Sequence, residues 1–139
     1  MSPKPSAQTL LDNARQYLAA LEILYVVGRN PPLASPSAFY LLVGFAIELA
    51  LKGLCLKKGK SEDDLRKVGH DLHKAYLMAK DQKAVPHYMT GLGRLVLEMN
   101  KQHKELTFRY TPDIPQIEAV DPGWCIERLK ELVEWCEKA

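Results

Sequence analysis

The chain has 139 residues, of which 47% are hydrophobic and 26% are charged, and its formal net charge is +2. This length suits one domain with a real core, and the composition is ordinary for a soluble globular protein. The small net charge excludes the strong overall positive field of an obligate nucleic-acid binder, so any basic patch must be local. We expect a single domain over residues 1–139, with residues 1–6 as a flexible tail.

Targeting and disulfide signals are missing from the sequence. The N-terminal residues MSPKPSAQ contain no apolar signal-peptide core, and the most apolar stretch, AFYLLVGFAI, is soon interrupted by Glu48 and Lys52. A membrane-spanning helix needs about 20 apolar residues in succession. The three cysteines show no C-x-x-C spacing, and Cys55 lies in an apolar run where a buried, reduced thiol is expected. The sequence therefore predicts a cytoplasmic protein without a membrane segment or a disulfide framework.

Two long helices are predicted in the first half of the chain. The first runs from residue 6 to about residue 27, and spacings of three and four residues predict an inward face made of Leu10, Ala14, Leu18, Leu21 and Tyr25. The second runs over about residues 36–58 and is apolar nearly all round, which is typical of a helix at the centre of a bundle. We therefore expect residues 38–56 to form the most buried helix.

The second half of the chain also has a helical pattern throughout its regular segments. Ser61 is expected to cap a short helix that ends at Gly69, and the next helix begins at His70–Asp71. A fifth helix is expected to begin near Pro86, with an inward face of Leu92, Leu95, Val96 and Met99. Asp121–Pro122 should open a last helix that buries Cys125, Leu129, Leu132 and Cys136. With no strand pattern or repeat, the sequence predicts an all-α, antiparallel up-and-down bundle of five to six helices.

The stretch GHDLHKAYLMA can cap a helix, bind a metal or transfer protons. A helix N-terminus leaves about four N–H groups without partners, and Asp71 or His70 can accept hydrogen bonds from them. His70 and His73 could share a helix face as metal ligands, but such a site needs three or four ligands. The sequence places neither His87 nor His103 near them. Capping is the commoner use, so we expect Asp71 and His70 to build a turn and expect no metal or other cofactor.

Glu48 is a carboxylate in a nearly all-apolar helix, where burial is costly unless the charge is paired. Lys52 lies one turn later, in the favourable orientation for a Glu–Lys pair. A structural ion pair at the edge of the bundle is the commoner outcome. The alternative is a polar network that meets the turn at Gly69–His70 or reaches Arg109. In both cases we expect Glu48 to be buried and paired.

The stretch FRYTPD combines a fixed cation, an aromatic hydroxyl and a rigid proline turn. Arg109 could bind phosphate through two hydrogen bonds. Arg109 and Tyr110 could equally pin the long loop onto the bundle, which is the commoner use. The residues GLG at positions 91–93 do not form a phosphate loop, because no strand precedes them.

In this order, FAIELALKGLCL, GHDLHKAY and RYTPD resemble the motifs of the HEPN domain (higher eukaryotes and prokaryotes nucleotide-binding) over roughly residues 8–138. Glu48 and Lys52 match its E-x-x-x-K helix, His70–Leu72 matches its H-D-L turn, and Arg109–Pro112 matches its R-Y-P loop. The resemblance implies an up-and-down helical bundle that is often dimeric. Its members include ribonuclease toxins, partners of small nucleotidyltransferases and non-catalytic binding modules.

The chain departs from the HEPN pattern in three places. Thr111 is inserted into the R-Y-P loop, and the glutamine often found before the glutamate is absent. Family ribonucleases carry an arginine separated by four to six residues from a histidine at the last core helix, whereas no histidine follows Arg109 here. The leading expectation is thus a non-catalytic HEPN-like module that binds a nucleotide, RNA or a protein partner, such as a nucleotidyltransferase in a toxin–antitoxin or defence pair.

The alternative is a divergent, metal-independent HEPN ribonuclease. In it, His70 or His73 would exchange protons, and Arg66 or Arg109 would stabilise the phosphate. For either function we expect a homodimer, from the resemblance and from apolar residues outside the core stripes, namely Ile23, Val26 and Trp135.

Overall fold

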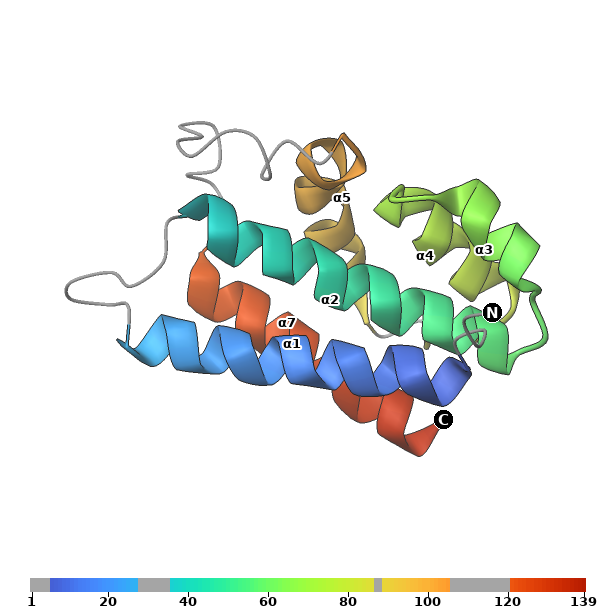
Figure 1. Cartoon of the computed structure of the whole chain (residues 1–139), viewed down its shortest axis with the longest axis horizontal. Coiled ribbons are helices and arrows are strands. Elements are labelled where there is room, and N and C mark those ends of the chain that lie inside the picture. The colour runs from blue at the N-terminus through green and yellow to red at the C-terminus, as the bar shows by residue number, and fades with distance from the viewer. Residues whose placement is uncertain (1–5, 28–35, 87–88, 106–120) are drawn as a thin grey trace, which may run out of the picture.

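Figure 1 shows a computed structural model of the chain, which describes residues 6–27, 36–86, 89–105 and 121–139. Arg109 and Tyr110 lie outside the described residues, as does all of the expected tail except Ser6. Ser6 is not part of a free tail, because its hydroxyl accepts a hydrogen bond from the backbone N–H of Thr9 at 3.1 Å. This contact caps the start of the first helix.

Every regular element among the described residues is a helix, which confirms the all-α class. The helices, numbered as in Figure 1, are α1 (Ala7–Val27), α2 (Pro36–Lys57), α3 (Glu62–Val68), α4 (Leu72–Asp81), α5 (Thr90–Lys104) and α7 (Pro122–Lys138). The expected start of a helix near Pro86 is wrong, because α5 begins only at Thr90. The carbonyl oxygen of Pro86 accepts a hydrogen bond from the backbone N–H of Met89 at 3.4 Å.

The central helix is α2, which contacts each of the other described helices. In Figure 1, α1, α2 and α7 lie side by side along the long axis of the molecule, and α1 runs opposite to the other two. Helices α3, α4 and α5 cover a further side of α2. The middle of α2 is therefore enclosed by segments that are distant in the sequence.

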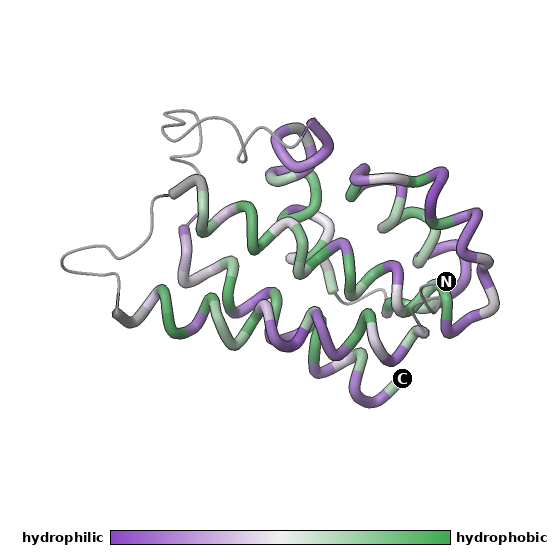
Figure 2. The backbone as a smooth tube through the Cα atoms, viewed as in Figure 1, coloured by the Kyte–Doolittle hydropathy of each residue, from purple (hydrophilic) through white to green (hydrophobic). Residues whose placement is uncertain are grey.

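The burial of α2 follows from its composition. The most deeply buried side chains on it include Val43, Ile47 and Leu51, each 0% exposed. In Figure 2, hydrophobic residues recur along α2, whereas hydrophilic residues prevail in α3 and the turn before it. By length and composition alone, Ala38–Lys57 could cross a membrane, but 67% of this stretch is buried inside the protein. The core helix of a globular domain has the same properties.

The inward faces predicted for α5 and α7 are buried, with all eight residues named for them in the core. The face predicted for α1 needs two corrections. Leu11 is buried and Leu10 only partly so, and Tyr25 is 38% exposed. The Tyr25 ring instead lies beside the first turn of α7, where a Cβ on Gly123 would be 3.2 Å from its hydroxyl oxygen.

Local capping rules predict the starts of α3 and α7 correctly. Ser61 and Asp64 exchange side-chain-to-backbone hydrogen bonds at 3.1 and 3.2 Å, which is a capping box at the start of α3. Asp121 caps α7, with proline in its first turn. Gly69 ends α3 with a φ of 61°, a conformation that favours glycine.

The apolar residues expected on a contact surface have different environments. Ile23 is 62% exposed, as expected, and the side chain of Val26 lies outside the described residues. Trp135 is not an exposed contact residue: it packs against the core, and its Nε1–H donates to the carbonyl oxygen of Ala84 at 2.6 Å. The indole is held there because its polar atom finds a partner inside the fold.

Candidate functional site

Glu48 lies near the middle of α2 and accepts hydrogen bonds from three side chains. Its Oε2 is 3.1 Å from Lys52 Nζ, and its Oε1 is 2.8 Å from His70 Nδ1 and 2.7 Å from His103 Nε2. His70 belongs to the turn before α4, and His103 belongs to the last turn of α5. We call these four residues the Glu48 network; it ties α2 to two other parts of the fold.

The hydrogen bonds define which ring nitrogens carry hydrogen. An ionised carboxylate only accepts, so His70 Nδ1 and His103 Nε2 must both donate to Glu48. His103 is 0% exposed, and its Nδ1 has no hydrogen-bond partner among the described residues. Hydrogen on that atom would leave a buried donor unsatisfied, so the geometry assigns the hydrogen of a neutral ring to Nε2.

The environment of Glu48 keeps it ionised. Burial by itself raises the pKa of this carboxyl group, because it disfavours the charged form. The hydrogen bonds from His103 and His70, together with the charge of Lys52, outweigh burial and lower the pKa from 4.5 to about 2. The side chains of Glu48 and Lys52 are only 7% and 14% exposed, so water screens their attraction weakly.

Aromatic packing holds both imidazole rings in place. The ring of Phe45 meets His103 edge-on at 4.8 Å and His70 edge-on at 5.9 Å between centroids. Gly44, the preceding residue of α2, makes room for His103, because a Cβ at that position would clash with the imidazole ring. His103 therefore packs directly on the backbone of α2.

A second set of polar contacts lies beside the network, at the start of α4. Asp71 caps this helix, since its Oδ1 accepts from the N–H of Lys74 at 3.0 Å. Asn100 of α5 donates to the same oxygen at 3.3 Å and accepts from the N–H of Leu72 at 2.7 Å. Burial opposes the charge of Asp71, but these hydrogen bonds and nearby Lys104 lower the pKa of its carboxyl group. The last two turns of α5 thus complete both the cap and the network.

The structure brings four of the candidate residues together. Glu48, Lys52, His70 and Asp71 lie at this junction, although only Asp71 caps α4, while His70 turns to Glu48 instead. The side chain of His73 makes no hydrogen bond within the described part of the chain. Two further candidates, Arg109 and Tyr110, lie outside that part. The expectation that Glu48 is buried and paired is confirmed.

His103 is the residue that the sequence reasoning missed. No sequence pattern places His103 near His70, yet both rings contact the same oxygen of Glu48. A signal was present: His103 follows Met99 by four residues and so continues the inward stripe of α5. A histidine at a core position requires a polar partner. Glu48, His70 and His103 also form a group of three metal-ligand atoms within 4.8 Å of one another.

A shallow groove borders the network between α1, α2 and α3. It has a volume of about 270 Å³ and is lined by Leu10, Glu48, Leu49, Lys52, Leu56, Glu62, Leu65 and Arg66. The side chain of Arg66 is 78% exposed and lies 3.5 Å from Asp63 at their closest charged atoms. The weaker candidate Arg66 is therefore near Lys52, on the rim of an apolar groove.

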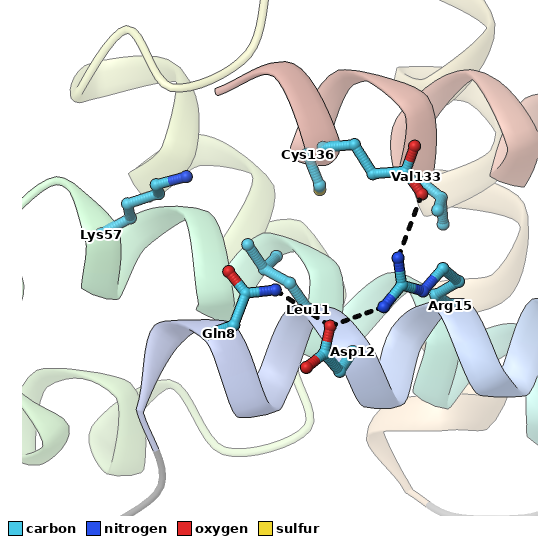
Figure 3. Close-up of a pocket in the computed structure, with 8 residues that line it drawn as sticks. Gln8, Leu11, Asp12, Arg15, Lys57, Val133 and Cys136 are labelled. Carbon is cyan, nitrogen blue, oxygen red and sulfur yellow. Dashed lines mark hydrogen bonds and ion pairs between the residues drawn. The ribbon is translucent and has the colours of Figure 1, made fainter.

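A second pocket, shown in Figure 3, has a volume of about 360 Å³ and lies where α1, α2 and α7 meet. Three of its charged residues pair with one another: Asp12 accepts from Arg15 at 2.8 Å and from Gln8 at 2.9 Å, and Arg15 lies 3.5 Å from Glu137. None of the candidate residues from the sequence lines this pocket.

Comparison of the chain with protein-family models, curated proteins and solved structures finds no match.

Proposed function

We propose that this chain is a non-catalytic, HEPN-like binding module, folded as an antiparallel up-and-down bundle, for a nucleotide or RNA. The supporting observation is the closed Glu48 network. Residues that match the E-x-x-x-K and H-D-L motifs bond to one another, and both oxygens of Glu48 accept from donors within the fold. A general base must lie within hydrogen-bonding distance of the proton that it removes. Glu48 is 6% exposed and already engaged, so its role is to hold the scaffold.

We assign ligand binding to the groove beside the network. Its volume of about 270 Å³ lies near the lower end of small-molecule pockets, which begin at about 300 Å³. Leu10, Leu49 and Leu56 are partly exposed and offer an apolar surface for a base. Arg66 on the rim presents the planar guanidinium group that suits phosphate. An apolar surface beside an arginine matches a nucleotide or the end of an RNA strand; a partner protein is the alternative occupant.

Binding of an adenine nucleotide and of a short single-stranded RNA, measured by calorimetry, tests this assignment. Arg66→Ala should weaken binding at least tenfold, because a hydrogen bond to a charged group contributes about 1.5–3 kcal/mol. Lys67→Ala is the matched control, since Lys67 is exposed on the same helix but does not line the groove. Equal effects of the two substitutions, or no saturable binding of either probe, would overturn the assignment.

A second candidate function, a metal-independent ribonuclease, is favoured by one feature of His70. Glu48 orients its ring through Nδ1, while the side chain is 41% exposed and Nε2 has no partner within the described residues. A carboxylate-bound imidazole of this kind can act as a general acid or base. Cleavage of RNA by the purified chain, abolished by His70→Ala without a change in melting temperature, would establish this function in place of the first.

We further propose that the chain acts in the cytoplasm as a homodimer. The HEPN resemblance supports a dimer, and it supports a nucleotidyltransferase partner in a toxin–antitoxin or defence pair. The side chain of Ile23 is 62% exposed, which supports a contact surface at this residue. Light scattering should give the mass of a dimer at micromolar concentration, and Ile23→Lys should shift it toward the monomer. A monomer mass for the unaltered chain would contradict this proposal.

A further inference from the structure

We propose that Glu48, His70 and His103 bind one divalent transition-metal cation, with Zn²⁺ as the best match. This proposal does not depend on the assignment of the groove. The hydrogen-bonded network is then the metal-free form of a site in which the cation takes the place of the two N–H···O contacts.

The residue types and positions carry the proposal. One atom from each of the three side chains lies within 4.8 Å of the other two, and the side chains come from three separate segments. Two imidazoles and one carboxylate are a familiar ligand set for Zn²⁺, with water in the fourth position. Glu48 and His103 are buried, whereas the His70 side chain is 41% exposed. Solvent can therefore supply the fourth ligand on the side of His70.

The change from hydrogen bonds to metal bonds requires small movements. The two contacts of Glu48 Oε1 measure 2.7 and 2.8 Å. Ligand atoms at about 2.0–2.1 Å from a tetrahedral ion lie about 3.3 Å apart, so the nitrogens must separate from the carboxylate by about half an ångström. His70 lies in the turn between α3 and α4 and can make this shift without moving a helix, whereas His103 belongs to the last turn of α5 and packs on the backbone of α2.

The hydrogens on the two imidazole rings and the charge of Lys52 limit the affinity of the site for the cation. A ring nitrogen that binds metal carries no hydrogen, so in a neutral ring the hydrogen moves to the opposite nitrogen. On half-exposed His70 that nitrogen can donate to water, but His103 Nδ1 has no partner in the described structure. The cation also competes with Lys52 for Glu48. These costs place the expected dissociation constant in the micromolar range.

Thiolate ligation can be distinguished from this ligand set. The three cysteines are buried, and burial raises the pKa of Cys125 and Cys136 to about 12. Their thiol groups are therefore poor ligands near neutral pH. A site made by the histidines should give a cobalt spectrum without sulfur-to-metal charge transfer.

Titration of the metal-free full chain with Co²⁺, followed by visible absorption and then displacement by Zn²⁺, tests the proposal. We expect one Co²⁺ per chain with the spectrum of nitrogen and oxygen ligands. His70→Ala should abolish this spectrum, while the neighbouring control His73→Ala should retain it. Lys52→Ala should tighten binding, because it removes the cation that competes for Glu48.

His70 is the residue to alter because it is half exposed, so its substitution should leave the fold intact, which circular dichroism will verify. Absence of saturable Co²⁺ binding, a sulfur-to-metal band, or an unchanged spectrum in His70→Ala would each overturn the proposal. Equal loss in His73→Ala would do so as well.

Discussion

Replacement of Glu48 by alanine is expected to be strongly destabilising. It leaves the ammonium group of Lys52, whose side chain is 14% exposed, without its carboxylate. It also leaves the Nε2–H of His103, at 0% exposure, without an acceptor. Removal of one member of a buried ion pair costs about 3–5 kcal/mol, whereas half-exposed His70 can turn to water and adds little. Domains are stable by about 5–15 kcal/mol, so the loss is a large share of the total.

Urea unfolding monitored by circular dichroism measures this loss directly. Glu98→Ala is the matched control, because Glu98 is an exposed helical glutamate, and such substitutions change stability by about 0.5 kcal/mol or less. Adding Lys52→Ala to the Glu48 variant should cost little more, since the two residues act as one pair. If Glu48→Ala unfolds within about 1 kcal/mol of the parent chain, the network does not hold the fold together and the reasoning is wrong.

Three further predictions concern neighbouring features. In metal-free protein, the free energy of unfolding should fall by about 3 kcal/mol as the pH drops from 4.5 to about 2. The reason is that the folded state lowers the pKa of Glu48, so the unfolded state binds the proton first. Acid titration of Glu48→Gln should not show this loss of stability. Asp71→Ala removes a helix cap and should lower the free energy of unfolding, measured in urea, by about 1 kcal/mol. Asp63→Ala alters an exposed residue and should lower it by less. Gly44→Ala should lower the melting temperature although alanine favours helices, because its Cβ meets His103; an increase would show that the ring is not packed there.

Much of the fold follows from short-range rules. The caps at Ser61, Asp71 and Asp121 are correct because a helix start is determined by a few consecutive residues. The burial of α2 is correct because a helix that is apolar on every face has to be enclosed. The shift from Leu10 to Leu11 and the exposure of Tyr25 were not predictable from one helix, since they depend on where α2 and α7 lie against α1.

Only part of the Glu48 network is predictable from the sequence, because the rest depends on how the helices pack against one another. The pairing of Glu48 with Lys52 is a contact between residues four apart on one helix, and periodicity reveals it. The contact with His103 joins residues 55 positions apart, and it exists only because α5 packs against α2 at Gly44. The polar residue in the apolar stripe of α5 indicated that some partner was needed, but no local rule could name it as Glu48.

The most direct test of the closed network is the nitrogen NMR spectrum of the His103 ring in metal-free protein at neutral pH. The account predicts hydrogen on Nε2 that exchanges slowly with water, no hydrogen on Nδ1, and loss of this signal in Glu48→Ala. Hydrogen on Nδ1 but not on Nε2, or rapid exchange of the ring hydrogen with solvent, would show that Glu48 does not hold His103 and would contradict the account.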